Sequence, residues 1–180
     1  NILDVVNQFD LSTYILKPEE IQDILQEVYM ELIPAEMRHL MGEYFSPDWI
    51  VEHALDLVGY KGDIEKTLID PTAGSGTFLT HAIKRIVSKS DGKLSRNDID
   101  KITHNVIGFD INPISVVSAK ANYILAVFSS CDDAVFEDFA DPINVPIYIA
   151  DSILSPVVYT EESELTLSID TSVGKFQIPK

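Results

Sequence analysis

Apolar residues recur along this chain in two patterns, at helical spacing and in short continuous runs. Helical spacing predicts helices over residues 18–33, 46–58, 77–89, 98–104 and 113–128. Short β-branched and apolar runs, typical of buried strands, predict strands over residues 67–69, 106–110 and 145–150. Strands and helices alternate, which predicts an α/β fold with a parallel sheet and right-handed crossovers.

The predicted elements divide the chain into three parts. Residues 1–41 form an N-terminal helical segment, residues 42–156 the α/β unit, and residues 157–180 an extension with a β-hairpin. Ser46 is expected to cap its helix. Two helices have apolar faces that we expect to point inward: Ile50, Val51, Ala54, Leu55 and Val58, and then Ile114, Val117, Ala121, Ile124, Leu125 and Phe128.

The turn after the first strand reads Asp70-Pro71-Thr72-Ala73-Gly74-Ser75-Gly76. Its two glycines can adopt positive φ and carry no Cβ, so a ligand can approach the backbone at the next helix's N-terminus. A dinucleotide fingerprint would need glycine where Leu79 stands, and a P-loop would need Gly-Lys-Ser/Thr. Asp70 would also repel phosphate. The turn therefore favours a ligand with a positive amino group and no phosphate, such as S-adenosylmethionine.

Each of the three predicted strands ends in an acid, namely Asp70, Asp110 or Asp151. Ligands of open α/β sheets bind at the carboxyl ends of the strands, so the three acids are expected to face one crevice. A ligand rich in hydroxyls and amines suits them. One acid would lie near an amino group, one on a ribose diol and one on an adenine amine.

Composition indicates one domain with its own core, because 46% of the 180 residues are hydrophobic. No apolar run approaches the roughly 18 residues of a membrane span, and no signal peptide is visible. The first residue is Asn, so we expect a segment of a longer protein. Cys131 is the single cysteine, which fits a reducing cytoplasm. The four histidines lack metal spacing and are expected to be surface or partly packed: His39, His53, His81 and His104.

The formal net charge is −16 and is unevenly distributed. The net charge is −10 in residues 1–60, +2 in residues 61–120 and −8 in residues 121–180. A nucleic-acid-binding surface should be basic, so most of this surface is unsuited to DNA. One basic stretch, Lys84 to Lys101, is more typical of a solvated helix end and loop than of a DNA contact.

Four motifs resemble those of the adenine-specific DNA methyltransferases of type I and fused type II restriction-modification systems. They are Gly42-Glu43-Tyr44-Phe45-Ser46-Pro47, Asp70 to Leu79, Ile107-Gly108-Phe109-Asp110-Ile111-Asn112-Pro113, and Ile149-Ala150-Asp151-Ser152. The resemblance covers about residues 20–155, and the family usually has threonine at Ser46. It implies a Rossmann-like methyltransferase fold, here with an incomplete parallel sheet, helices on both faces and S-adenosyl-L-methionine as cofactor.

The resemblance also implies roles for individual residues. Ser46 and the Gly74–Gly76 backbone would hold the methionine end, with Asp70 near its amino group. Asp110 would accept the ribose hydroxyls, Ile111 would pack on the adenine, and Asp151 would accept from the adenine amine. The full set of expected cofactor-binding residues is Tyr44, Phe45, Ser46, Pro47, Asp70, Pro71, Thr72, Ala73, Gly74, Ser75, Gly76, Phe78, Asp110, Ile111, Asn112, Asp151 and Ser152.

Structural roles compete with these assignments. Tyr44 and Phe45 could form a hydrophobic staple, Ser46 could be a helix cap alone, and Asp110 could cap its following helix.

The family's catalytic motif, Asn/Asp-Pro-Pro-Tyr/Phe/Trp, does not occur in this chain, and Asn112-Pro113-Ile114 is not a version of it. We therefore expect no catalytic residue here, only a part that holds the methyl donor. DNA, and possible specificity and restriction subunits or domains, would be contacted through other parts of the parent protein. The alternatives are an RNA or protein-glutamine methyltransferase, a non-catalytic cofactor-binding module, and a nucleotide-binding protein of another class.

Overall fold

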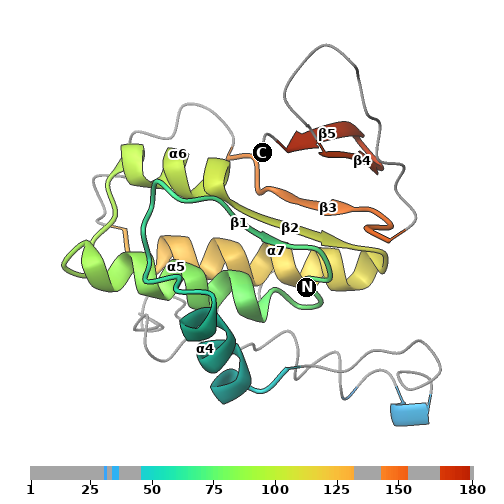
Figure 1. The fold of residues 1–180 in the computed structure, drawn as a ribbon, viewed down its shortest axis with the longest axis horizontal. Helices are drawn as coiled ribbons and strands as arrows, with labels where there is room; N and C mark the ends of the chain where they lie inside the picture. Colours follow the sequence, from blue (N-terminus) through green and yellow to red (C-terminus); the bar gives the residue numbers. More distant parts are fainter. Residues whose placement is uncertain (1–30, 32–33, 37–45, 132–142, 154–166, 179–180) are drawn as a thin grey trace, which may run out of the picture.

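The computed structural model describes residues 31, 34–36, 46–131, 143–153 and 167–178 (Figure 1). In the last range, side chains are described for residues 171–174. Apart from Glu31, which is helical, the predicted helix over residues 18–33 lies outside the described residues, as do the motif residues Tyr44 and Phe45.

Three parallel strands form the sheet in the order β1-β2-β3 (Figure 1). They are β1 (Leu68–Asp70), β2 (Val106–Asp110) and β3 (Ile147–Ile149). In the register, Asp70 lies opposite Gly108, and Asp110 lies opposite Ile149. The parallel sheet predicted from the sequence is confirmed, although β3 is shorter than the apolar run over residues 145–150.

Four helices accompany these strands. They are α4 (Asp48–Leu57), α5 (Thr77–Lys89), α6 (Arg96–Asn105) and α7 (Pro113–Phe128). No helix among the described residues has the length and apolar character needed to cross a membrane.

Local sequence explains where two of the helices begin. Ser95 and Asp98 form a reciprocal capping box at the start of α6. Asn112 caps α7 by accepting a hydrogen bond from the Ile114 amide, and Pro113 occupies the first helical position. Helix α4 differs from the prediction, because Pro47 stands at its N-cap and the start has no side-chain cap. Ser46 therefore lies one residue before the cap.

Helices α5 and α7 pack against one face of the sheet, α6 contacts β2, and α4 contacts α5. Their buried side chains join Leu68, Val106 and Ile147 in one core cluster. The other face carries a small separate cluster around Ile107 and Phe109, to which the described residues contribute no helix. The chain steps from β1 to β2 to β3 in one direction, and right-handed crossovers then place both connections on the same face. Within the described residues, the sheet therefore lacks the second helical layer that the sequence predicts.

The inward face predicted for α7 is wrong for Ile114, Val117 and Ile124, whereas Phe128 packs against the main core as predicted. Ile114 and Val117 are 52% and 67% exposed, whereas Ser118, Ala119 and Asn122 are buried. Small residues face inward because α7 approaches the glycine turn closely: a Cβ on Gly76 would lie 3.1 Å from the Ala119 Cβ. Ile50 and Val58, predicted to point inward from α4, are also exposed.

A two-stranded antiparallel hairpin follows the sheet, as the sequence predicts. It consists of β4 (Leu167–Thr171) and β5 (Gly174–Ile178). The Ser172 amide in its turn donates to the Ile149 carbonyl at 3.0 Å, so the turn lies against the outer edge of β3. The three-part division of the chain stays a prediction.

Gly76→Ala is expected to destabilise the protein more than Gly74→Ala. Both glycines have positive φ, which costs an alanine about 1–2 kcal/mol. At Gly76 the new methyl group would also press on Ala119, whereas at Gly74 it would meet no atom within 4 Å. Urea denaturation of both variants measures the difference, and equal losses of unfolding free energy would contradict the close contact with α7.

Candidate functional site

The glycine turn between β1 and α5 packs against α7. Gly74 and Gly76 have φ values of 55° and 90°, and Gly76 is the N-cap of α5. The buried Asn122 amide donates to the Ser75 carbonyl at 3.0 Å. The space beside the Gly74 Cα stays open, because no atom lies within 4 Å of a Cβ placed there. Gly74 therefore marks the side of the turn that a ligand can approach, whereas Gly76 serves the packing of α7.

Asp110 connects the end of β2 to this turn. Its carboxylate accepts one hydrogen bond from the Gly74 amide and one from the Asn112 amide, each at 2.8 Å. Asp110 does not cap α7, since Asn112 has that role. A carboxylate has about four lone-pair sites, so two are left for a ligand.

Asp70 is the most deeply buried of the three strand-end acids. It is 9% exposed, and its Oδ1 accepts from the Thr72 amide at 3.1 Å. Its buried Oδ2 accepts no hydrogen bond within the described part of the chain. Burial raises the pKa of Asp70 and the nearby charge of Asp110 adds to this, while the Thr72 amide opposes it. This buried carboxylate oxygen is suited to a hydrogen-bond donor, above all a cationic one.

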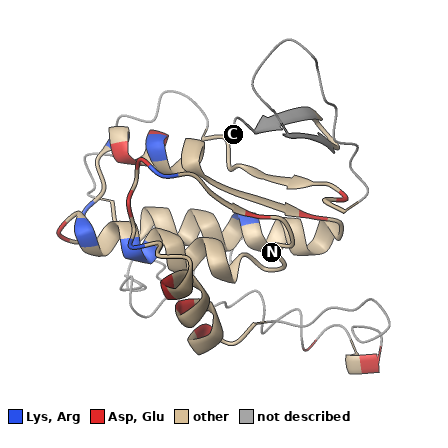
Figure 2. Cartoon of the chain, in the orientation of Figure 1, with Lys and Arg blue, Asp and Glu red and all other residues tan. Residues whose placement is uncertain are grey.

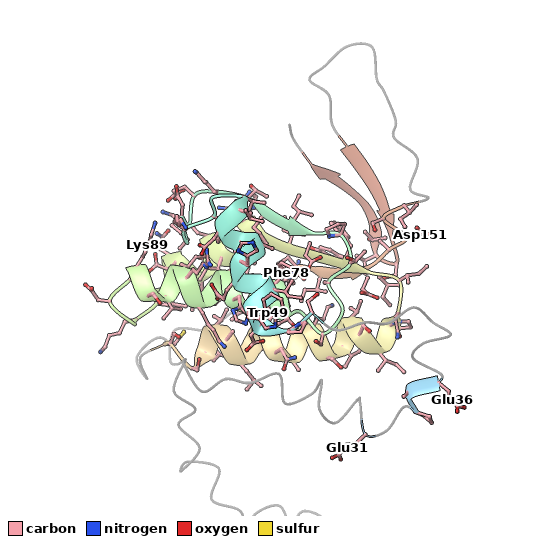
Figure 3. The ribbon with its side chains drawn as sticks, turned by 60° about the horizontal axis from the view of Figure 1, so that its bottom comes forward. Glu31, Glu36, Trp49, Phe78, Lys89 and Asp151 are labelled. Carbon is pink, nitrogen blue, oxygen red and sulfur yellow. The ribbon has the colours of Figure 1, made fainter. Side chains whose placement is uncertain are left out.

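The third acid, Asp151, follows β3 in a tight turn. Its Oδ1 accepts from the Ile153 amide at 3.0 Å. The adjacent Ser152 hydroxyl donates to the Pro71 carbonyl at 2.7 Å, which fastens this turn to the one after β1. Acidic residues thus gather at the carboxyl ends of all three strands (Figure 2), and Figure 3 labels Asp151 among them.

A pocket of about 360 Å³ opens at this edge of the sheet. It is lined by Pro71, Thr72, Asp110, Ile111, Ala150, Asp151, Ser152 and Ile153. Ile111 and Ile153 are 68% and 85% exposed. They offer apolar contact to a flat ring, and the two acids offer acceptors.

Six of the predicted site residues line the pocket, and the others have different places. Ser75 is buried, Phe78 packs against the main core, and Ser46 is half-buried before α4. Sequence reasoning missed Ala150 and Ile153. The motif at the end of β3, Ile149-Ala150-Asp151-Ser152, includes Ala150, so the strand-end position could have revealed it. Ile153 follows an irregular turn, and no periodic pattern marks it.

A second cavity of about 240 Å³ lies near the opposite edge, where β2 and β3 begin. It is lined by Arg96, Asp100, Thr103, His104, Ile143 and Asn144. Arg96 already forms an ion pair with Asp100 at 3.2 Å. This cavity lacks the strand-end acids and the glycine turn.

The described residues contain no cluster of three or more His, Cys, Asp or Glu side chains suited to a metal ion. Of the described histidines, His53 and His104 are exposed, as the sequence predicts. His81 is instead buried at 7% exposure and lies beside Glu52. Cys131 is half-buried just after α7, and its thiol donates to the Val127 carbonyl at 3.2 Å.

Comparison with known proteins agrees with this geometry. The family model described as N-6 DNA methylase matches residues 20–156. The methylase subunit of the type I restriction enzyme MjaVII from Methanocaldococcus jannaschii is 25% identical over 167 residues, which are 93% of this chain and 24% of that protein. The adenine-specific methyltransferase PglX from Streptomyces coelicolor is 28% identical over 135 residues, covering 70% and 11% of the two chains. No solved structure matches.

Asp70→Asn is expected to raise the melting temperature at pH 7 by a few degrees. Because the pKa of Asp70 is raised above 3.8, the folded state favours the protonated acid. The stability that protonation provides is present below pH 3.8 and is lost as the pH rises through the raised pKa. An asparagine keeps an acceptor for the Thr72 amide and removes the buried charge, which burial and the nearby charge of Asp110 both disfavour.

Thermal melts between pH 4 and pH 8 measure this effect, with Asp91→Asn as the control that removes an exposed acid. The gain from Asp70→Asn should shrink as the pH falls. A gain of the same size in the control, or one that is independent of pH, would contradict the burial argument.

Proposed function

The chain belongs to the N-6 DNA methylase family, and from this we propose that it forms the S-adenosylmethionine-binding part of an adenine-specific DNA methyltransferase. The parent enzyme would transfer the methyl group to the exocyclic N6 amine of adenine in DNA. Since the chain spans 24% and 11% of the two relatives, that activity belongs to a larger protein. The proposal implies a Rossmann-like methyltransferase fold, of which the three-stranded sheet would be one part.

The observation that carries the proposal is a pocket at the carboxyl ends of the strands, which Asp110 and Asp151 line together with Pro71 and Thr72 from the start of the glycine turn. Asp70, the last residue of β1, directly precedes that turn. Two free lone-pair sites on Asp110 suit the ribose hydroxyls of the cofactor. The unsatisfied Asp70 oxygen suits the cationic amino group of its methionine part. Asp151 would accept a hydrogen bond from the adenine amine, and Ile111 and Ile153 would pack on the faces or edge of the adenine ring.

The same arrangement disfavours phosphate-bearing ligands. Two carboxylates at the turn would repel a di- or triphosphate, and no lysine follows Gly76 to neutralise one. The methyl donor, when bound, supplies an electrophilic methyl group on a positively charged sulfur. This chain's residues would bind and orient that donor through the acceptors described above.

The acceptor side of the reaction would be supplied by other parts of the parent protein. The Asn/Asp-Pro-Pro-aromatic motif is absent from the 180 residues, and Asn112 with Pro113 begins α7. Within the described sheet, β1 pairs with β2 alone, so its other edge is available for a further strand. A loop following such a strand would reach the carboxyl edge, where the pocket lies, and could receive a flipped adenine.

DNA contacts are also assigned to other parts. The net charge of −16 opposes approach to a polyanion. Within the basic stretch, Arg85 pairs with Glu52 and Lys101 pairs with Glu65. Because one relative is a type I methylase subunit, specificity and restriction subunits or domains are further candidate partners. Such a system would operate in the cytoplasm.

Isothermal titration calorimetry of the 180-residue chain tests the proposed ligand. S-adenosylmethionine is expected to bind weakly but measurably, and ATP and NAD to bind no better. Tighter binding of ATP would contradict the inference that Asp70 and Asp110 repel phosphate groups. An absence of heat with S-adenosylmethionine, from a chain that melts cooperatively, would contradict the cofactor assignment itself.

Asp110→Ala is expected to weaken S-adenosylmethionine binding by a factor of ten or more. Hydrogen bonds to a charged group contribute about 1.5–3 kcal/mol each, and two are proposed to the ribose. The substitution also removes the acceptor of the Gly74 and Asn112 amides, so a lower melting temperature should accompany the loss.

Calorimetry well below the melting temperature of the variant separates the two effects. Asp100→Ala serves as the control, since it removes an acid at the second cavity. Unchanged affinity in a folded Asp110→Ala variant would exclude the ribose role.

A further inference from the structure

A cluster of charged side chains joins α4 to α5 outside the pocket. Asp48, Glu52 and Asp56 are spaced four residues apart and share one face of α4, while His81 and Arg85 share one face of α5. The His81 Nδ1 lies 2.5 Å from a Glu52 oxygen, and its Nε2 lies 3.4 Å from Asp48. Arg85 forms ion pairs with Glu52 and Asp56. We call these five residues the α4–α5 cluster.

Arg85 uses all five N–H donors of its guanidinium within this contact. Nε donates to the Glu52 carboxylate at 3.1 Å, and Nη1 donates to Asp56 at 3.0 Å and to the Tyr60 carbonyl at 2.6 Å. Nη2 donates to the Glu52 carbonyl at 3.0 Å and also to its carboxylate. The Arg85 side chain is 15% exposed. A lysine, with three donors at one nitrogen, could not make this set of bonds.

Helix α4 depends on the cluster because its apolar packing is slight. Its fully buried side chains are Val51 and Leu55, whereas Trp49, Leu57 and Val58 are 71%, 74% and 77% exposed. Burial alone would raise the pKa of Glu52, but the hydrogen bonds from His81 and Arg85 outweigh burial and lower it below 4.5. Glu52 is therefore charged at neutral pH and attracts both partners.

The residues that pair with each other occur in the same order along α4 and α5. Asp48, the first residue of α4, faces His81, while Asp56, near the end of α4, faces Arg85. His81 lies about one helical turn inside α5, whose N-cap is Gly76. Ser46 precedes Asp48 by two residues, which span at most about 7 Å. The start of α4 thus lies at the end of α5 that carries the glycine turn.

We propose that the α4–α5 cluster is a positioning device for the cofactor site, which fixes Ser46 and Pro47, the described residues before α4, beside the glycine turn. None of its five residues lines the pocket. Their effect on binding would pass through the position of Ser46 and Pro47, and would concern the methionine end of the cofactor. This inference rests on the proposed function.

Arg85→Met tests the proposal, since it keeps the length of the side chain and removes the five donors. The control is Lys101→Met, which breaks the exposed ion pair between Lys101 and Glu65 without touching α4. Amide hydrogen exchange and the fluorescence of Trp49, the single tryptophan and a residue of α4 (Figure 3), report the attachment of α4. Calorimetry compares S-adenosylmethionine with 5′-methylthioadenosine, which lacks the amino-acid part.

The proposal expects Arg85→Met to speed exchange in α4 and alter Trp49 fluorescence while β1–β3 stay protected. S-adenosylmethionine affinity should fall about tenfold, a typical coupling between contacting groups, with 5′-methylthioadenosine affinity unchanged. Lys101→Met should change none of these. If Arg85→Met fails to fold, Glu52→Gln replaces it, because the amide keeps the shape and removes the charge that both α5 residues face.

Each other outcome overturns the proposal. A released α4 with unchanged S-adenosylmethionine affinity would overturn the positioning role and leave the proposed function intact. An unaltered α4, or an equal loss of affinity for both ligands, would show that the cluster does not act through the methionine end. Failure of the unsubstituted chain to bind S-adenosylmethionine would overturn the proposed function, and the positioning role with it.

Discussion

The site depends on the two hydrogen bonds that the Asp110 carboxylate accepts from the Gly74 and Asn112 amides, each at 2.8 Å. These bonds connect the turn after β1 to the end of β2 and to the start of α7. Asn122 supports the same turn from the buried side of α7 through the Ser75 carbonyl. The turn is thus fixed from two directions, while the space beside Gly74 stays open for a ligand. A preorganised turn of this kind lowers the entropy cost of binding.

The acids gathered at this site lower the stability of the folded protein. Parallel pairing brings the ends of β1 and β2 to one edge, so Asp70 and Asp110 come close enough for their charges to interact. The buried Asp70 oxygen has no donor in the described part of the chain. Such a group costs free energy in the folded protein and recovers it when a cationic donor binds. A carboxylate retained in this position is better explained by ligand binding than by folding.

The sequence predicted features with a local cause and missed features that arise between distant elements. The bounds of β2, the start of α7 at Asn112 and the acids after the strands followed from runs and cap residues. The buried face of α7 did not follow, because Gly76 brings the helix close enough that small residues such as Ala119 face inward. The burial of His81 also went unpredicted, since its partner Glu52 lies on another helix, 29 residues away.

The central claim is that S-adenosylmethionine binds at the carboxyl edge of the sheet, between the glycine turn and the Asp151 turn. A ¹⁵N-¹H NMR titration of the chain with this ligand tests the claim most directly. The account predicts progressive shifts of the Thr72, Gly74, Asn112 and Ile153 amides, with the Thr103 and His104 amides at the second cavity unchanged. Shifts confined to the second cavity, or an unchanged Gly74 amide at saturation, would contradict it.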